Sequence, residues 1–262
     1  MRILLVVILA ACSSDAPAHR TPVARAANTL RIASYNMNFG LAGQPAGVDA
    51  IARTEADIVL LQETNARWAD AITRATQFPE HRFGDPPSDR MAAGGLGVLS
   101  RYPIVSIDKL LPTDGGFFFA WRIVIDAPTG RTQLLDVHLR PPLGDDGSWI
   151  TGYFSTRAVR VGELARHLAD LDPTLPTIIA GDFNETGDGD AIAQLRARGY
   201  TDAIAQFHDT EHTWRWPIAG GELRFQLDHI FYDAHFAASA SDIIDAGNSD
   251  HLPIRADFTR KD

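Results

Sequence analysis

The sequence predicts an α/β fold, of the α+β kind, in which mixed sheets carry helices on their outer faces. Three observations predict it: short apolar runs typical of strands recur along the chain, a few segments have helical spacing, and strands and helices do not alternate strictly. The 262 residues are 45% hydrophobic and 22% charged, an ordinary globular composition that excludes a fibrous or largely disordered protein. We find no internal repeat, and one domain accounts for residues 29–262.

Apolar runs define the expected strands. Residues 30–36 alternate apolar and polar side chains, as a half-buried strand does, whereas residues 58–62 form a continuous apolar run, typical of a strand buried on both faces. Further strands are expected at 97–100, 120–126, 133–138, 177–181, 229–232 and 254–258. Helices are expected at 48–56, 156–170 and 187–198, of which the second has the clearest helical spacing.

The first residues have the pattern of a secretion signal. One positive charge, Arg2, precedes nine apolar residues at 3–11, a run too short to cross a hydrocarbon core that needs about 20 residues. Residues 9–12, Leu-Ala-Ala-Cys, resemble the lipobox of bacterial lipoproteins, which implies cleavage before Cys12 and lipidation of its sulfur. Ser13 after the cysteine resembles the sorting signal for the outer membrane of a Gram-negative bacterium. A short buried strand with a chance cysteine is the alternative.

Charge and composition limit the classes of function. Residues 12–28 are rich in Ser, Ala, Pro and Arg, which predicts a flexible tether that joins the lipid to the domain. The lone cysteine excludes an intramolecular disulfide. The formal net charge is −9, and removal of residues 1–11 takes away Arg2 and leaves −10. Such acidity weighs against a DNA-binding protein, whose affinity depends on basic side chains that neutralise phosphates.

Polar residues follow several of the predicted strands directly. Asn36, Glu63, His138 and Asp182 each come at the end of an apolar run that must be buried. Asn184 lies two positions after Asp182, so on an extended chain both side chains point to the same side. The starts of two further strands carry Asp228, Asp250 and His251. One such residue is usually a cap, but several together indicate a site, because loops on a rigid sheet carry functional groups.

Six short motifs, in this order, resemble those of the endonuclease/exonuclease/phosphatase superfamily. The motifs are Ser34-Tyr35-Asn36-Met37-Asn38, Leu61-Gln62-Glu63-Thr64, Asp136-Val137-His138-Leu139, Gly181-Asp182-Phe183-Asn184, Leu227-Asp228-His229-Ile230 and Ser249-Asp250-His251-Leu252-Pro253. They extend over about residues 30–260, and six in order are far more specific than any one. The resemblance implies a four-layered αββα sandwich of two packed mixed sheets, with the site at one edge of the sheets.

The resemblance also implies metal-dependent hydrolysis of phosphoesters. Such a reaction needs a nucleophilic water, neutralisation of charge on the phosphoryl oxygens, and help for the leaving oxygen. Glu63 is a hard oxygen ligand of the kind that suits Mg²⁺. By resemblance Glu63 is the principal metal ligand, Asn36 lies beside it, and Asp250 is a candidate for a second metal position. The implied cofactor is Mg²⁺, with Mn²⁺ as a substitute.

The remaining motif residues receive catalytic roles from the same resemblance. Asp182 and Asn184 would orient the attacking water and the phosphate. His251 would be hydrogen-bonded to Asp228, which would fix the tautomer of the ring and favour the imidazolium. His138 would donate to the phosphoryl oxygen in the transition state. Which histidine acts as base, acid or electrostatic clamp stays open at this point.

Two aromatic side chains and two arginines are candidates for substrate binding. Trp214 and Trp216 lie in an expected loop, where they could stack on a base, a sugar or a lipid head group, or merely cover the sheet edge. Arg101 and Arg140 follow strands and could meet phosphate charge, with a structural role equally open.

Other polar patterns have simpler interpretations. Residues 182–193 mimic an EF-hand loop, but the last position lacks the bidentate Glu and a strand rather than a helix precedes the loop. Arg157, Arg160 and Arg166 lie with Glu163 on one side of the clearest helix. Their spacing predicts a solvated face rather than a nucleic-acid patch.

Together these features predict an exported, membrane-anchored, divalent-metal-dependent phosphoester hydrolase, expected to be a monomer. A small phosphodiester, a lipid head group or a nucleotide is the expected substrate, because each needs fewer positive contacts than DNA. A DNA endonuclease of the same fold is the first alternative, opposed by the acidic charge and by the presence of only two lysines. A non-catalytic surface lipoprotein is the second, opposed by the complete set of motifs.

Overall fold

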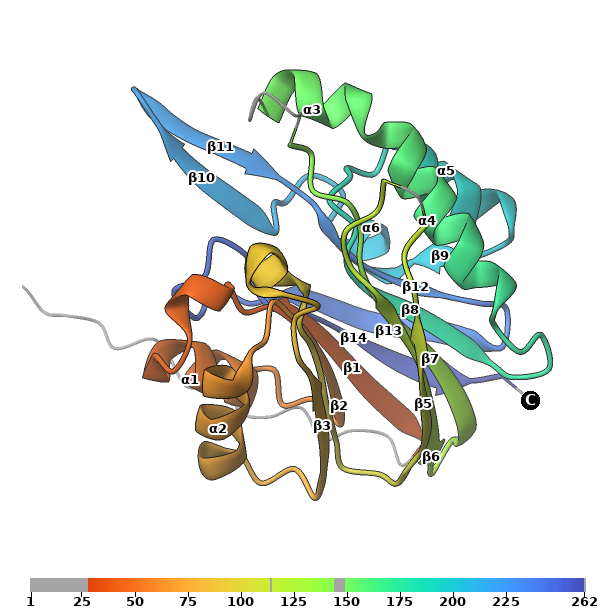
Figure 1. Ribbon diagram of the computed structural model, residues 1–262. Helices are drawn as coiled ribbons and strands as arrows, with labels where there is room; N and C mark the ends of the chain where they lie inside the picture. Colours follow the sequence, from red (N-terminus) through yellow and green to blue (C-terminus); the bar gives the residue numbers. More distant parts are fainter. Residues whose placement is uncertain (1–27, 114, 144–148, 262) are drawn as a thin grey trace, which may run out of the picture.

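The computed structural model describes residues 28–113, 115–143 and 149–261. Two six-stranded mixed sheets pack face to face, and helices cover the outer face of each, so that the chain forms four layers (Figure 1). This arrangement confirms the predicted αββα sandwich. The expected signal peptide at 1–11, the lipidation residue Cys12 and the tether up to residue 27 lie outside the described residues.

The strands of both sheets come from distant parts of the chain. The first sheet contains β1 (Thr29–Asn36), β2 (Ile58–Gln62), β3 (Glu80–Gly84), β4 (Leu96–Ser100), β13 (Phe236–Ile243) and β14 (Ile254–Arg260). Its order is β13-β14-β1-β2-β4-β3. The second sheet contains β5 (Ile104–Leu110), β6 (Ala120–Ala127), β7 (Gly130–His138), β8 (Thr177–Asp182), β9 (Thr201–Asp202) and β12 (Asp228–Tyr232), in the order β5-β6-β7-β8-β12-β9. A separate hairpin consists of β10 (Trp214–Ile218) and β11 (Gly221–Phe225).

The helices fall into two groups. The first half of the chain supplies α1 (Pro45–Arg53) and α2 (Ala66–Ala75), with short 3-10 turns at Phe39–Leu41 and Asp89–Gly94. The second half supplies α3 (Trp149–Ser155), α4 (Arg157–Ala169), α5 (Asp190–Ala197) and α6 (Ala203–Phe207). Within the described ranges, no helix combines the length and the apolar character that a membrane span requires.

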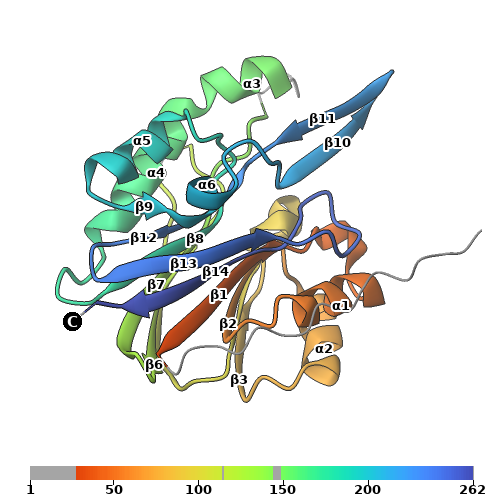
Figure 2. The same cartoon turned by 180° about the vertical axis from the view of Figure 1, so that it is seen from behind.

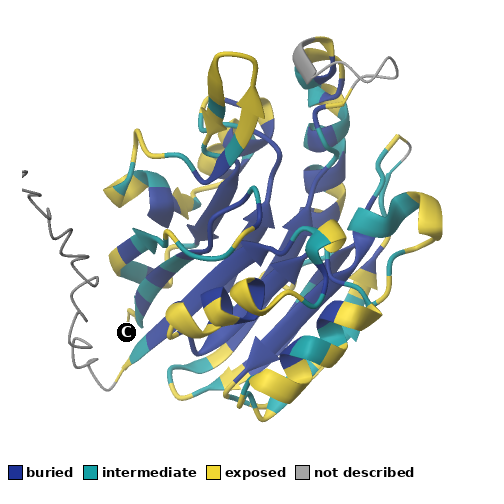
Figure 3. Cartoon of the chain, turned by 90° about the vertical axis from the view of Figure 1, so that its left-hand side faces the viewer, coloured by how far each residue is buried: buried dark blue, intermediate teal, exposed yellow. Residues whose placement is uncertain are grey.

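Alternation along the central strands explains the continuous apolar runs. In β1, Leu30 and Ile32 face the second sheet and join the core between the sheets, whereas Ala33 and Tyr35 face outward. Successive side chains of a strand point to opposite faces, and in β1 both sets are covered. The expectation of a half-buried strand at residues 30–36 is therefore wrong, because the polar side chains of Arg31, Ser34 and Asn36 are buried as well. The buried strands therefore form the centre of the sandwich, as Figure 3 shows in dark blue.

Each sheet has its own helical cover. Trp68 and Ile72 of α2 pack with α1 on the outer face of the first sheet. Leu164 and Leu168 of α4 pack with α5 on the outer face of the second sheet. Figures 1 and 2 show these helix pairs on opposite sides of the two sheets.

The strand order brings the predicted site residues to one edge of the sandwich. β1 and β2 are parallel, as are β7 and β8, so each pair ends at the same edge. The register places His138 opposite Asp182, and the antiparallel β12 places Asp228 opposite Asp182. Because β1 lies against β8 in the other sheet, Asn36 at the end of β1 reaches the same edge.

The structure differs from the sequence-based expectations at the sheet edges and on one helix. The unexpected strands β3, β5, β9 and β13 are the four edge strands of the two sheets. The expectation of a loop at Trp214 and Trp216 is wrong, because both residues belong to the hairpin strand β10. The expectation of a solvated face on α4 is also wrong in part, because Arg160 and Glu163 are fully buried. Arg160 donates to the backbone oxygen of Tyr153 at 2.9 Å, which satisfies the buried guanidinium in part.

Candidate active site

Asn36 and Glu63 form one corner of the site. The side-chain nitrogen of Asn36 donates to Glu63 Oε1 at 3.1 Å and to Asp182 Oδ2 at 3.0 Å, which links the two sheets. The backbone N–H of Phe39 donates to Glu63 Oε2 at 3.1 Å. Burial raises the pKa of Glu63 above its ordinary value, although both donors oppose the shift. The ionised carboxylate is therefore costly here unless a cation faces it.

Backbone strain concentrates at the same edge. Among the described residues, four that are not glycine have a positive φ, namely Asn38, Glu55, Glu63 and Asn184. Three of them belong to the site. Glu63, with φ of 57°, follows β2 directly, so the left-handed conformation turns the chain as the strand ends. Such conformations are uncommon outside glycine and persist where the surroundings impose them, as at functional sites.

Asp182 lies at the centre of the site. Its Oδ1 accepts from the backbone N–H of Asn184 at 2.8 Å, and its Oδ2 accepts from Asn36. The same Oδ2 lies 3.6 Å from Nε2 of both His138 and His251. Burial raises the pKa of Asp182 to about 7, against the opposing positive charge of His251. A carboxylate in this position can take up or release a proton near neutral pH.

His251 is held between two carboxylates. Its Nδ1 lies 2.8 Å from Asp228 Oδ2, a contact that the resemblance had implied. Burial by itself lowers the pKa of His251, but the charges of Asp228 and Asp182 outweigh burial and raise the pKa to about 10. Thr213 fixes Asp228 in turn, because its hydroxyl donates to Asp228 Oδ2 at 2.6 Å and accepts from the Asp228 backbone N–H. The ring therefore carries a positive charge at neutral pH.

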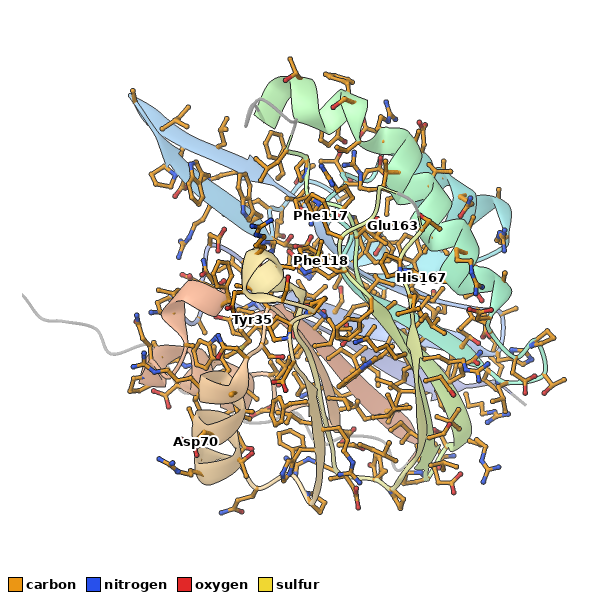
Figure 4. The ribbon with its side chains drawn as sticks, in the orientation of Figure 1. Tyr35, Asp70, Phe117, Phe118, Glu163 and His167 are labelled. Atoms are coloured by element: carbon orange, nitrogen blue, oxygen red, sulfur yellow. The ribbon has the colours of Figure 1, made fainter. Side chains whose placement is uncertain are left out.

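His138 differs from His251 in its surroundings and in its charge. Its ring is buried and stacks on Phe118, with ring centroids 4.3 Å apart and an interplanar angle of 27°. Burial and the charge of His251 lower the pKa of His138 to about 3, so the ring is neutral. Its Nδ1 has no hydrogen-bond partner in the described part of the chain. Figure 4 shows Phe118 beside Phe117, above the ends of the central strands.

Asn184 and Asp250 border the site. The side-chain amide of Asn184 donates to the backbone oxygen of Leu139 at 3.0 Å, which leaves its Oδ1 available. Asp250 Oδ1 accepts from Asn38 Nδ2 at 2.8 Å, and Oδ2 accepts from the indole N–H of Trp214 at 3.0 Å. Oδ1 also accepts from Ser249 Oγ at 3.4 Å, whereas Oδ2 keeps a second lone pair, so a role at a second metal position stays a prediction.

The two candidate arginines do not reach the carboxylates. Arg101 lies at the opposite edge of the first sheet, because β4 is antiparallel to β2 and ends where β2 begins. Its backbone N–H donates to Asp57 O at 2.9 Å, and its guanidinium donates to Ala56 O at 3.2 Å. Arg140 lies near His138 in sequence, but its guanidinium stacks on Phe117, 3.4 Å from the ring centroid.

The two candidate tryptophans occupy different positions on the hairpin. Trp214 is buried at the base of the hairpin, where it touches Asp250 and pairs its backbone with His251. Trp216 is half exposed and stacks on Trp214, with ring centroids 6.2 Å apart and planes 7° from parallel. Trp214 therefore belongs to the catalytic edge, whereas Trp216 lies farther out.

Three contact residues were not found from the sequence: Asn38, Phe118 and Thr213. Asn38 stands in a quoted motif but received no role, although an amide two residues beyond Asn36 was a usable signal. Phe118 and Thr213 lie in irregular segments, and no local pattern relates them to His138 or Asp228. His229, which was left out of the site, lies elsewhere: its Nδ1 is 2.7 Å from Asp202 Oδ2.

The side chains present fit a divalent cation. The acidic groups of the site are Glu63, Asp182, Asp228 and Asp250. Among the described residues, no lysine or arginine forms an ion pair with any of them, and the partners are histidines. One ligand atom each from Asp182, Asp228 and His251 lies within 4.8 Å of the others, so this buried group could also bind a metal. Hard oxygen donors without basic counterions are the chemistry of Mg²⁺ and similar cations.

Comparisons with known proteins agree with this geometry. Residues 33–251 match the model of the Endonuclease/Exonuclease/phosphatase family. A search of curated proteins finds no match. Solved structures share the fold at low sequence identity.

The catalytic domain of human Nocturnin, solved with a bound sulfate anion, has a TM-score of 0.69 and 17% identity, covering 89% of this chain and 95% of that one. A family protein from Beutenbergia cavernae has a TM-score of 0.67 and 19% identity, covering 89% and 72%. TDP2 from Caenorhabditis elegans has a TM-score of 0.65 and 15% identity, covering 88% and 74%. The chain belongs to the endonuclease/exonuclease/phosphatase family and is a phosphoester hydrolase of that family.

Proposed function

We propose that the chain is a divalent-metal-dependent hydrolase of small phosphodiesters. The observation that carries this proposal is the cluster of four carboxylates beside a charged imidazole, without a lysine or arginine ion pair among the described residues. A binding module for a neutral partner would only lose stability from such a cluster, because buried like charges repel. Phosphoester hydrolysis needs both a cation and groups that hold protons.

Glu63 would hold the cation, with Asn36 beside it and Asp250 near a second position. When bound, a divalent cation neutralises charge on the phosphoryl oxygens and makes a water more acidic. Mg²⁺ suits this donor set because it prefers oxygen ligands and keeps several of its waters. We expect Mn²⁺ to substitute for it.

The other residues of the site would hold protons or accept them during the reaction. Asp182, with a pKa raised by burial to about 7, is placed to orient a water and accept its proton. His251 keeps its proton between Asp182 and Asp228 and offers positive charge at the phosphoryl oxygens. His138 is neutral and would donate a hydrogen bond without adding charge. The backbone N–H of Asn184 and the Asn36 amide hold Asp182 in place, and Asn184 Oδ1 would help to orient the water.

Small substrates fit the charge distribution better than DNA. The protein has a formal net charge of −9 and two lysines. Lys109, on β5, lies over the ring of Phe119, the residue before β6, and Lys261 directly follows β14. Many arginines are engaged with acids, as in the pairs of Arg31 with Asp257 and of Arg122 with Asp108. DNA affinity depends on free basic groups along a groove, so a DNA endonuclease is the weaker proposal.

We further propose that the protein is exported and anchored to a membrane through Cys12. The support is the sequence pattern alone: one basic residue, nine apolar residues and a Leu-Ala-Ala-Cys end. Residues 12–28 would then give the domain a tether of about 60 Å at most, if fully extended.

The proposal is tested with a chromogenic phosphodiester. The full chain should release 4-nitrophenolate from methyl 4-nitrophenyl phosphate with Mg²⁺ or Mn²⁺ and lose this activity in excess chelator. Turnover that chelator leaves unchanged would contradict the metal requirement. Absence of turnover with every metal would favour the non-catalytic lipoprotein. A panel of plasmid DNA, sphingomyelin, inositol phosphates and nucleotides then ranks the substrate classes.

Glu63→Gln is the matching variant. It should lower metal-dependent turnover at least about a hundredfold, because a carboxamide binds a hard cation more weakly than a carboxylate does. The fold should survive, since an amide keeps the size and one acceptor. Glu80→Gln on the edge strand β3 is the control, because Glu80 is partly exposed and, in the described part of the chain, forms an ion pair only with Arg82, at 3.4 Å. Equal loss in both variants, or an unfolded Glu63→Gln, would count against the assignment.

A further inference from the structure

The hairpin of β10 and β11 has one apolar face. Trp214, Trp216 and Ile218 alternate along β10 and therefore point to the same side. Their partners across the hairpin include Phe225 opposite Trp214 and Leu223 opposite Trp216, which lie on the same face. The other face carries the charged and polar residues of both strands. An amphipathic hairpin of this kind needs something apolar against one side.

Most of this apolar face is open to solvent. Trp216 is 50% exposed, Ile218 47% and Phe225 37%. A two-stranded hairpin is marginally stable by itself, and here only its base is buried against the sandwich. Figures 1 and 2 show the hairpin projecting from the catalytic edge, with α3 close to it on one side. Contiguous exposed apolar surface of this kind marks a binding site rather than chance exposure.

A cavity of about 380 Å³ lies between this face and α3. Leu223 and Phe225 of β11 line one side and Phe154 of α3, itself 66% exposed, lines the other. Leu227 and Tyr153 complete most of the apolar wall. We call this space the hairpin cavity. Its volume is within the range of sites that bind small molecules.

The hairpin cavity is lined in part by residues that neighbour the catalytic residues in sequence. Leu227, which lines it, precedes Asp228, the partner of His251. Thr186, which also lines it, follows Asn184 by two residues. At the base of the same hairpin face, Trp214 donates to Asp250. A substrate whose phosphate lies among the catalytic carboxylates therefore has this cavity next to it.

The polar groups around the cavity are already engaged with one another. The hydroxyl of Tyr153 lies 2.8 Å from Thr186 Oγ1, and Thr186 Oγ1 also donates to Asp188. Arg157 pairs with Asp190 at 3.1 Å. A nucleobase would bring several donors and acceptors that need partners, whereas a hydrocarbon group needs none. The lining therefore favours a hydrocarbon occupant.

We propose that the hairpin cavity binds the hydrocarbon chain of an amphiphilic phosphoester, while the phosphate of the same molecule lies at the catalytic edge. This inference rests on the proposed function for its phosphate end. It names the substrate class as a phosphoester that carries an aliphatic chain. The remaining exposed face, Trp216 and Ile218, would cover the part of a longer chain that extends beyond the cavity.

The test measures binding rather than turnover. Octylphosphonate and methylphosphonate, in solution as monomers, are titrated into the full chain with Mg²⁺ by calorimetry. Octylphosphonate should bind roughly a hundredfold more tightly, because each buried methylene contributes about fourfold and the cavity takes about half of the added seven. Phe154→Ser and Leu223→Ser should each lower the ratio of the two affinities, octylphosphonate over methylphosphonate, at least about tenfold. Leu111→Ser should keep it, since Leu111 is 67% exposed, as Phe154 is, but lies after β5.

Each outcome decides between occupants. A ratio near one overturns the inference, and so does a large ratio that Phe154→Ser and Leu223→Ser leave unchanged. Loss of phosphatidylcholine vesicle binding in Phe154→Ser, with a ratio near one, would assign the face to a membrane surface instead. Loss of a dimer in Phe154→Ser, with a ratio near one, would assign it to a second copy. Turnover of methyl 4-nitrophenyl phosphate tests the proposed hydrolase separately. Turnover together with an affinity ratio near one would contradict only the proposed role of the cavity. A hundredfold affinity ratio without turnover would contradict only the proposed hydrolase.

Discussion

Replacement of Glu163 should make the unfolding free energy less sensitive to pH. Glu163 is a fully buried acid on α4, and its Oε2 accepts from the backbone N–H of Arg140 at 2.8 Å. Its Oε1 packs on Gly116, where an added Cβ would lie 2.2 Å away, and the backbone of Phe117 also stabilises the ionised form. Burial raises the pKa of Glu163 from 4.5 to about 7. Figure 4 shows this side chain on α4, near His167.

The sign and size of the effect follow from linkage. The folded protein holds the proton on Glu163 more tightly than the unfolded chain does. Its contribution to stability is therefore fully present below pH 4.5 and is lost as pH rises through 7. The difference between 4.5 and about 7 corresponds to roughly 3 kcal/mol. Glu163→Gln removes this dependence, but its amide N–H₂ would replace one of the two acceptor oxygens and cost about 1–3 kcal/mol at every pH.

The assay is urea unfolding of the wild type and Glu163→Gln from pH 4 to pH 8. We expect the variant to be less stable at pH 4 and to gain about 3 kcal/mol relative to the wild type by pH 8. The difference between the two proteins isolates Glu163 from the other titrating groups. Two curves that stay parallel over this range would refute the reasoning, whatever their offset.

Three further predictions concern the site and the amino terminus. Asp228→Asn should slow turnover less than His251→Ala does. The double mutant should be about as slow as His251→Ala, because the effects of groups that act as a unit are not additive. Rate losses that multiply in the double mutant would contradict the pairing of Asp228 with His251. Mg²⁺ at a hundredfold excess over its Kd should stabilise the fold by about 2.7 kcal/mol and raise Tm by several degrees. That rise should vanish in Glu63→Gln. Cys12→Ser should accumulate as an unprocessed precursor, and labelled fatty acid incorporated into it would show the lipidation prediction to be wrong.

The centre of each sheet could be predicted from the sequence, but the edges could not. β2 was predicted with its bounds, and β1, β4, β6, β7, β8, β12 and β14 were predicted within a few residues. Most of these strands are largely buried, and burial favours apolar side chains; β14, which is buried on one face, shows the alternating pattern instead. The edge strands β3, β5, β9 and β13 are largely half-buried or exposed, so selection for apolar residues is weaker there and the pattern fades.

The residues of the candidate site, too, could be predicted from the sequence only in part. Asn36, Glu63, His138 and Asp182 were visible because each ends a buried strand, and the strand order brings those ends together. Thr213 was not visible, because its contact with the Asp228 carboxylate depends on how a loop returns to β12. Such contacts are set by tertiary packing, which leaves no periodic signal in a single sequence. The burial of Arg160 and Glu163 was missed for the same reason.

Two neighbouring amides hold the catalytic groups of the two sheets in register. Asn36 and Gln62 are partners on β1 and β2, and each reaches across to the second sheet. Asn36 donates to Asp182 at 3.0 Å, and Gln62 Nε2 donates to Asp136 Oδ1 at 2.7 Å. Apolar packing between the sheets is non-directional, so by itself it would tolerate small shifts of one sheet over the other. Buried hydrogen bonds do not tolerate such shifts, because a broken one leaves polar groups without partners. The cation-binding corner at Glu63 and the proton-holding group at Asp182 come from different sheets, and these amides fix the distance between them.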